Sequence, residues 1–188
     1  MDYWLKFYKT LGTQLQTPSR FCAWVSDYFK DDAHTMTVLD AGCGNGRDAY
    51  GLAQHFKSVH GVDSCGYVPE NAGTVCTFEK GDFCTHPKDG VDLVYSRFTF
   101  HSITNAQHEE FLSSVPKWLC IETRSDKDTR PHVHGEDHYR NPTNAEYLKK
   151  LLEKHDFEVK FFVECDDFAP YKDENPVCIR VVALKKCQ

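Results

Sequence analysis

The sequence predicts an α/β fold, in which helices cover a mostly parallel sheet. Three observations support this prediction. Short apolar segments alternate with segments of helical spacing along the chain. A glycine-rich string, Gly42-Cys-Gly-Asn-Gly46, separates the first apolar segment from the helix that follows it. An acidic residue, Asp63, ends the second apolar segment, where open parallel sheets bind their ligands.

The residue patterns predict seven strands and at least four helical regions. The expected strands cover residues 37–41, 58–62, 74–78, 91–95, 118–122, 157–164 and 177–184. Helices are expected within the first thirty residues and over residues 48–56, 107–115 and 144–155. Residues 123–141 are expected to form a polar, histidine-rich loop. Because no helix separates the last two strands, we expect them to pair antiparallel through a turn near residues 173–176.

Length and composition exclude several classes of protein. The 188 residues suffice for one domain with a sizeable core. The net charge of −6 argues against a nucleic-acid binder. No apolar run approaches the roughly 20 residues that span a bilayer. The nine cysteines contain no C-x-x-C pair, so we expect reduced thiols in a cytoplasmic protein rather than a disulfide framework or a zinc ribbon.

The glycine string and Asp63 together predict a nucleotide-type cofactor. Glycines allow a sharp turn and let a ligand approach the backbone closely. Asp63 lies 21 residues after Gly42 and can accept both hydroxyls of a ribose. The string departs from the G-x-G-x-x-G of dinucleotide folds, and an NAD-dependent oxidoreductase stays open as an alternative. A tight turn without a ligand is the alternative explanation of the glycines.

The same residues resemble the class I S-adenosylmethionine-dependent methyltransferases. Val38–Gly46 looks like their first motif, Gly61–Asp63 like the second, Gly81–Phe83 like the third and Val91–Ser96 like the fourth. The resemblance implies a Rossmann-like, seven-stranded sheet in the order 3-2-1-4-5-7-6, within a single domain over residues 1–188. It also implies S-adenosylmethionine as cofactor, held by Trp4, Tyr8, Ser19, Asp40, Gly42, Cys43, Gly44, Arg47, Asp63, Ser64, Gly81, Asp82, Phe83, Ser96 and Arg97.

The segment before the glycine string adds a narrower resemblance. Tyr3-Trp4, Tyr8, Pro18-Ser-Arg-Phe21 and Gly46-Arg47-Asp48 are similar to small methyltransferases grouped with tellurite-resistance and surface-polysaccharide enzymes. This implies that residues 1–35 form a helical cap over the cofactor, with aromatic rings near the sulfonium. An amphipathic helix that only packs on the core is the alternative.

The residues after the fourth strand bear on the acceptor of the methyl group. The string Tyr95–His101 lacks the Asn/Asp-Pro-Pro-aromatic tetrad of enzymes that methylate amines, and Ser96 replaces the carboxylate of magnesium-dependent catechol enzymes. The Lys-Asp-Lys-Glu set of ribose-methylating cap enzymes is also missing. His101 is the candidate general base, because a neutral imidazole titrates near neutral pH; a buried histidine without a catalytic role is the alternative. The substrate-binding candidates are Arg97, Arg124, Asp126, His138, Tyr139 and Arg140.

Polar strings in the second half suggest a sugar acceptor. Residues 121–128, 138–140 and 169–180 look like methyltransferase domains found beside glycan-decorating proteins, including those of large algal viruses. This resemblance implies O-methylation of a sugar hydroxyl in a small or oligosaccharide acceptor, by a monomer or homodimer. A thiol, oxyanion or amine acceptor and a non-catalytic cofactor-binding module stay open. We predict no metal site. His132-x-His134 and His138 have the residue types and a plausible spacing for metal ligands, but the simpler interpretation of this segment is a polar lid over the acceptor site.

Overall fold

The computed structural model describes residues 2–11, 17–67, 75–128, 139–171 and 174–186. Its strands form one seven-stranded sheet in the order β3-β2-β1-β4-β5-β7-β6, which confirms the expected topology. The strands are β1 Thr37–Ala41, β2 Ser58–Asp63, β3 Cys76–Lys80, β4 Leu93–Arg97, β5 Trp118–Arg124, β6 Phe157–Cys165 and β7 Cys178–Lys185. The helices are α1 Asp2–Leu11, α2 Arg20–Tyr28, α3 Arg47–Leu52, α4 Asn105–Ser113 and α5 Ala145–Lys154, with short 3-10 turns η2 Ala33–Thr35 and η3 Phe100–Ser102.

The strand directions follow from the connections between the strands. The strands β3, β2, β1, β4 and β5 run parallel to one another. β7 runs antiparallel to both β5 and β6, as expected for two strands without a helix between them. The carboxyl ends of β1, β2, β4 and β5 therefore meet along one edge, which is where the sequence places its candidate site.

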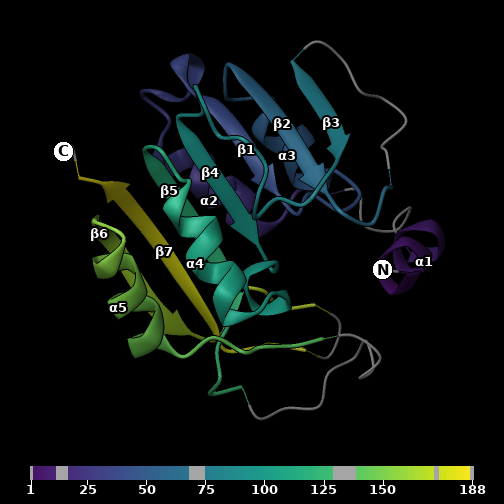
Figure 1. Cartoon of the computed structure of the whole chain (residues 1–188). Coiled ribbons are helices and arrows are strands. Elements are labelled where there is room, and N and C mark those ends of the chain that lie inside the picture. Colours follow the sequence, from purple (N-terminus) through teal and green to yellow (C-terminus); the bar gives the residue numbers. More distant parts are fainter. Residues whose placement is uncertain (1, 12–16, 68–74, 129–138, 172–173, 187–188) are drawn as a thin grey trace.

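Two hydrophobic cores cover the two faces of the sheet. Figure 1 shows α4 and α5 in front of the sheet and α2 and α3 behind it. The front core joins residues of α4 and α5, such as Phe111 and Leu148, to the facing side chains of the central strands. The rear core joins Phe21 and Val25 of α2 and Leu52 of α3 to the opposite side chains of the same strands. α1 lies apart from both layers, near the arrowheads of β2 and β3 (Figure 1).

Several boundaries differ from the expected ones. The helix expected over residues 48–56 ends at Leu52, because the chain turns there to enter β2 and the Lys57 N–H bonds back to Ala33 and Met36. β3 and β4 each begin two residues later than expected. The Asp92 carboxylate, just before β4, accepts the Thr37 N–H at 3.0 Å. This side-chain hydrogen bond connects the start of β4 to the start of β1.

The polar loop expected over residues 123–141 is shorter than expected at its start. β5 continues to Arg124, and Ser125 forms an isolated bridge to Thr143. His132, His134, His138 and Asp173, which carry parts of the sequence-based predictions, lie outside the described residues.

The cysteines of the described segments are free, and most are buried. Burial raises the pKa of every one of these thiols: that of Cys76 to about 11 and those of Cys65, Cys84 and Cys178 to about 12. A thiol with a raised pKa is a poor nucleophile and a poor metal ligand. These residues therefore act as small apolar side chains. Among the described helices, none has the length and apolar character needed to cross a membrane.

Candidate active site

The glycine loop follows β1 and leads into α3. The N–H groups of Gly42 and Cys43 both donate to the carbonyl of Val62, at 2.8 and 3.2 Å, so the loop is fixed beside the end of β2. Gly42, Gly44 and Gly46 have φ angles of 79°, 55° and 77°, in the left-handed region that favours glycine. A Cβ on Gly42 would also lie 2.0 Å from the Thr99 methyl group. The loop therefore requires glycine at this position for both conformation and space.

Asp63 lies directly beside this loop, as the sequence predicts. One carboxylate oxygen accepts the Gly44 N–H at 2.9 Å, and the other accepts the Cys65 N–H at 2.8 Å. Each carboxylate oxygen has more than one lone pair and can accept a further hydrogen bond. Asp63 is half-buried. It is thus oriented by the backbone and still has the capacity to bind a ribose diol.

Asp40, at the end of β1, carries a polar atom without a partner. The residue is 2% exposed, and its Oδ2 atom has no hydrogen-bond partner among the described residues. Burial raises the pKa of Asp40 well above its ordinary value, and the nearby carboxylates of Asp48 and Asp63 raise it further. An unpaired carboxylate oxygen in such a place requires an explanation. A cationic ligand on the glycine loop would supply the missing partner.

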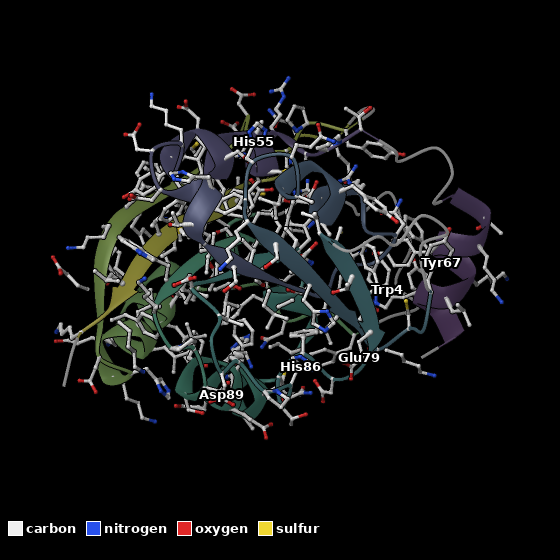
Figure 2. The ribbon with its side chains drawn as sticks, turned by 90° about the horizontal axis from the view of Figure 1, so that it is seen from above. Trp4, His55, Tyr67, Glu79, His86 and Asp89 are labelled. Carbon is white, nitrogen blue, oxygen red and sulfur yellow. The ribbon has the colours of Figure 1, made fainter. Side chains whose placement is uncertain are left out.

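An aromatic cluster lies over the glycine loop. A Cβ on Gly44 would be 2.2 Å from the hydroxyl oxygen of Tyr8, so the Tyr8 phenol rests directly on that glycine. The Tyr8 ring lies 6.2 Å from that of Trp4 and 6.0 Å from that of Tyr67. Figure 2 shows Trp4 and Tyr67 at the same end of the molecule, beside α1. Sequence reasoning missed Tyr67, although it is the first aromatic residue after the second motif.

Ser19 joins two helices beneath the loop. Its N–H and its hydroxyl donate to the two carboxylate oxygens of Asp48, both at 2.7 Å. The Tyr95 hydroxyl donates to the same carboxylate at 2.7 Å. Arg47 lies next to this group, with its Nε atom 3.9 Å from Asp48 Oδ1. Asp48 was expected only as part of a motif, and the structure shows it, on α3, as the acceptor shared by Ser19, the N-cap of α2, and Tyr95 of β4.

A buried chain of charges continues from Asp48. Arg97 Nε lies 4.0 Å from Asp48 Oδ2 and donates to Glu122 Oε1 at 2.9 Å. Arg180 Nε donates to Glu122 Oε2 at 2.7 Å, and Glu122 is fully buried. Burial alone would lower the pKa of Arg97, but the carboxylates of Glu122 and Asp48 raise it. The Arg97 guanidinium is therefore charged and held between two carboxylates.

The third motif forms a turn after β3. The Gly81 N–H donates to the Asp63 carbonyl at 3.2 Å, so this turn lies next to the ribose candidate. Asp82 is exposed, and its Oδ1 accepts the Cys84 N–H at 2.9 Å. The Phe83 ring is buried and lies 5.9 Å from Phe111 in the front core. Ser64 is exposed on the other side of Asp63.

Thr99 closes the site between the ends of β1 and β4. The Ser96 and Thr99 hydroxyls lie 2.5 Å apart, and Thr99 Oγ1 donates to the Ala41 carbonyl at 3.1 Å. Phe98, between them in sequence, has a φ angle of 59°, which is strained for a bulky residue. Such strain occurs most often where a ligand or substrate is positioned. Neither Thr99 nor Phe98 was among the residues expected from the sequence.

Residues 13–160 match the sequence profile of a family described as a methyltransferase domain, and this segment is well over half of the chain. The chain belongs to this methyltransferase family. No curated protein matches the sequence at a significant level.

Solved structures share the methyltransferase fold. A SAM-dependent methyltransferase from Anabaena variabilis has a TM-score of 0.73 and 19% identity, over 98% of this chain and 92% of that one. A Burkholderia thailandensis 1,6-didemethyltoxoflavin-N1-methyltransferase has a TM-score of 0.72 and 17% identity, over 97% and 85%. The magnesium protoporphyrin IX methyltransferase of Synechocystis, crystallised with bound SAH, has a TM-score of 0.68 and 17% identity, over 98% and 94%. At these identities the likeness concerns the fold alone.

His101, the predicted general base, lies within η3 and is 5% exposed. Its Nδ1 atom is 3.3 Å from Thr123 Oγ1 and 3.4 Å from the Arg124 nitrogen. The Phe98 ring lies 5.6 Å from the imidazole. The structure thus places the predicted base beside the end of β5.

The other predicted acceptor residues are more scattered. The Arg124 guanidinium is largely buried and contacts Glu174 at 2.8 Å and Asp128 at 3.5 Å. Asp126 is exposed and accepts from the Asn144 amide at 2.7 Å. Tyr139 is 55% exposed and Arg140 is half-buried. Arg124 contacts His101 directly, through its backbone N–H.

We expect Asp63→Ala to lower the affinity for S-adenosylhomocysteine by about 100-fold. The substitution removes two carboxylate oxygens that can accept hydroxyl groups, and hydrogen bonds to charged groups contribute about 1.5–3 kcal/mol each. It also releases the Gly44 N–H. Isothermal titration calorimetry measures the effect, with the exposed Asp31→Ala as control. An unchanged affinity in the Asp63 variant would show that the cofactor ribose is bound elsewhere.

Proposed function

We propose that the protein transfers a methyl group from S-adenosylmethionine to a hydroxyl of a small neutral acceptor, a sugar within a glycan. The observation that carries the proposal is the buried, unpartnered carboxylate of Asp40 beside the glycine loop. A sulfonium cofactor brings positive charge to this place. A dinucleotide would instead bring a negatively charged pyrophosphate to the glycine loop beside Asp40, which argues against the NAD-dependent alternative.

The residues of the site fit this cofactor. When bound, S-adenosylmethionine supplies an electrophilic methyl group on its sulfonium. Asp63 would accept the ribose hydroxyls, and the Asp82–Phe83 turn, joined to Asp63 through Gly81, would border the adenine. Asp40 would face the cationic end. Tyr8 and Trp4 of α1 support a cap over the loop, because the Tyr8 phenol already contacts Gly44.

His101 is proposed to remove the proton of the acceptor hydroxyl. A base needs a free lone pair on Nε2, which requires the proton of the neutral ring to be on Nδ1. Thr123 Oγ1 lies 3.3 Å from Nδ1 and can accept this N–H, while the Thr123 hydroxyl in turn lies 3.1 Å from Thr143 Oγ1. The Arg124 N–H at 3.4 Å favours the opposite tautomer. Thr123 is therefore the residue on which the basic tautomer depends.

The charges around His101 favour a neutral acceptor. The Arg97 guanidinium is engaged by Glu122, and that of Arg124 by Glu174 and Asp128. Their charges are thus already balanced by carboxylates, which lowers their value for binding an oxyanion. A neutral polyol requires hydrogen-bonding groups rather than net charge. The choice of a sugar among neutral acceptors rests on the resemblance of the polar strings in residues 121–180.

We expect His101→Ala to lower kcat by about 10²- to 10⁴-fold, the range that general acid–base groups contribute. The affinity for S-adenosylhomocysteine should stay unchanged, because Thr123, Arg124 and Phe98, which His101 contacts, lie outside the glycine loop. Thr123→Val should lower kcat less and shift the pH profile, since it removes the acceptor that supports the basic tautomer. The exposed His34→Ala is the control. A variant at His101 with full activity would exclude the proposed base.

An acceptor panel tests the class of substrate. Labelled cofactor is incubated with rhamnose- and fucose-type glycosides, thiols, oxyanions and small amines, and mass spectrometry identifies the products. Methylated glycoside supports the proposal. Methylated amine, thiol or oxyanion without methylated sugar overturns the sugar acceptor. Binding of S-adenosylhomocysteine without turnover on any acceptor would instead indicate a non-catalytic cofactor-binding module.

A further inference from the structure

We propose that His60, Glu79 and His86 form a binding site for a divalent transition metal ion of the zinc type. The ligand atoms of these three side chains all lie within 4.8 Å of one another. Two imidazoles and one carboxylate are a ligand set that binds zinc in proteins, with a fourth position for water or another ligand. The site is separate from the glycine loop, and it differs from the absence of metal expected from the sequence.

The sheet register brings two of the ligands together. His60 on β2 is paired with Thr77 on β3, and Glu79 lies two residues further along β3, on the same face as Thr77. His60 Nε2 is 3.6 Å from Glu79 Oε2. Ligand atoms around a tetrahedral zinc ion, with bonds of about 2.0–2.1 Å, lie about 3.4 Å apart. The His60–Glu79 pair therefore needs little movement to bind one ion.

His86 completes the set from the turn that follows β3. Its ring centre lies 5.4 Å from that of His60. Its backbone N–H donates to the Asp82 carbonyl at 2.9 Å, which fixes the turn. Figure 2 shows His86 and Glu79 next to each other on one side of the molecule. A metal ion here would link residues 81–92, the segment between β3 and β4 that contains Asp82 and Phe83, to β2 and β3.

Thr77 orients the His60 ring for metal binding. His60 Nδ1 lies 2.8 Å from Thr77 Oγ1, and in the tautomer that suits metal binding the ring donates its Nδ1–H to this hydroxyl. The lone pair of the neutral imidazole is then on Nε2, the atom that faces Glu79. Metal-binding histidines commonly donate their other N–H to an oxygen in this way, and loss of such a partner costs about 10- to 100-fold in affinity.

The site opens onto a hollow. A cavity of about 300 Å³ is lined by His60, His86, Thr77, Asp89 and residues at the start of β1 and β2. Residues 81–92 form turns rather than the helix that usually connects parallel strands, and Thr77 and Glu79 are exposed on this face. The fourth coordination position would therefore be reachable by water or by a small anionic ligand.

Zinc titration of the metal-free, full-length protein tests the proposal. We expect one Zn²⁺ per chain by isothermal titration calorimetry, and a rise in Tm of about 5 °C at a concentration of 100 times Kd. His60→Ala, His86→Ala and Glu79→Gln should each weaken binding at least 100-fold, and Thr77→Val about 10-fold. His55→Ala is the matched control, because His55 is exposed on the opposite side in Figure 2.

Competing outcomes are separated by further variants. His132→Ala/His134→Ala should bind zinc like the wild type. Loss of binding in this double variant, with retained binding in the His60 and His86 variants, would overturn the proposal. Absence of one-to-one zinc binding in the wild type would also overturn it. S-adenosylhomocysteine affinity and circular dichroism show whether each variant is folded, and Glu79→Gln, at an exposed position, is the substitution that disturbs the fold least.

Discussion

Glu122→Ala should lower the free energy of unfolding by about 3–5 kcal/mol, the largest loss of stability that we expect from a single substitution in this protein. Glu122 is fully buried and accepts from Arg97 at 2.9 Å and from Arg180 at 2.7 Å. Its removal leaves two buried guanidinium groups without their shared carboxylate. Because burying an uncompensated charge is costly, the penalty greatly exceeds that of a lost surface ion pair.

Urea denaturation monitored by circular dichroism measures this loss. Glu158→Ala is the matched control: Glu158 is exposed on β6 and pairs with Lys160 at 2.6 Å, so its loss should change stability by less than about 0.5 kcal/mol. Glu122→Gln keeps the shape of the side chain and one acceptor, and its effect should lie between the two. A loss below about 1 kcal/mol in Glu122→Ala would mean that Asp48 or solvent compensates both arginines.

Asp40→Asn should have opposite effects on stability and on cofactor binding. It removes a buried carboxylate with an unpartnered oxygen, and we expect the free energy of unfolding at neutral pH to rise by about 1–3 kcal/mol. The same change removes the negative charge that would face the cationic cofactor. The affinity for S-adenosylmethionine should therefore fall by about 100-fold. This trade between stability and function is typical of binding sites.

The pH dependence of Asp40→Asn has a definite sign. Burial, with the carboxylates of Asp48 and Asp63, raises the pKa of Asp40 in the folded protein above its ordinary value of 3.8. Asp40 therefore keeps its proton up to a higher pH in the native state than in the unfolded state. As the pH rises from the unfolded-state pKa to the native-state pKa, this residue makes the wild type progressively less stable. The stability advantage of Asp40→Asn should grow from acid to neutral pH.

Thermal denaturation from pH 4 to pH 8, beside calorimetry with S-adenosylmethionine, measures both effects. The exposed Asp31→Asn serves as control and should change neither quantity. If Asp40→Asn destabilises the protein at neutral pH, the carboxylate is already compensated in the folded state. If the variant binds the cofactor as tightly as the wild type, the Asp40 carboxylate does not face the cationic part of the cofactor.

Local pattern determined most of the fold. The alternation of apolar strands with helical segments, and the missing helix between β6 and β7, were sufficient for the strand directions, since each depends on neighbouring residues along the chain. The motif resemblance supplied the strand order. Element ends were less predictable: β4 starts at Leu93 because Asp92 bonds to Thr37, a residue that precedes it by more than fifty positions.

The sequence also predicted that the glycine loop and Asp63 lie side by side. The glycine loop and Asp63 belong to adjacent parallel strands, so the edge of the sheet brings them together, and the Gly44–Asp63 hydrogen bond follows from that position. Glycine in a left-handed turn is a local requirement, which a sequence records directly.

Only the tertiary structure decided which charged side chains meet. Asp48, Arg97, Glu122 and Arg180 come from four elements, and His60, Glu79 and His86 from three, at spacings that follow no motif. Their contacts depend on how distant elements pack, and for the residues on strands a register shift of one residue would send the side chain to the other face. The sequence determined the methyltransferase fold and its glycine loop, while packing between distant segments determined the buried charges, the surroundings of His101 and the cluster that we assign to a metal.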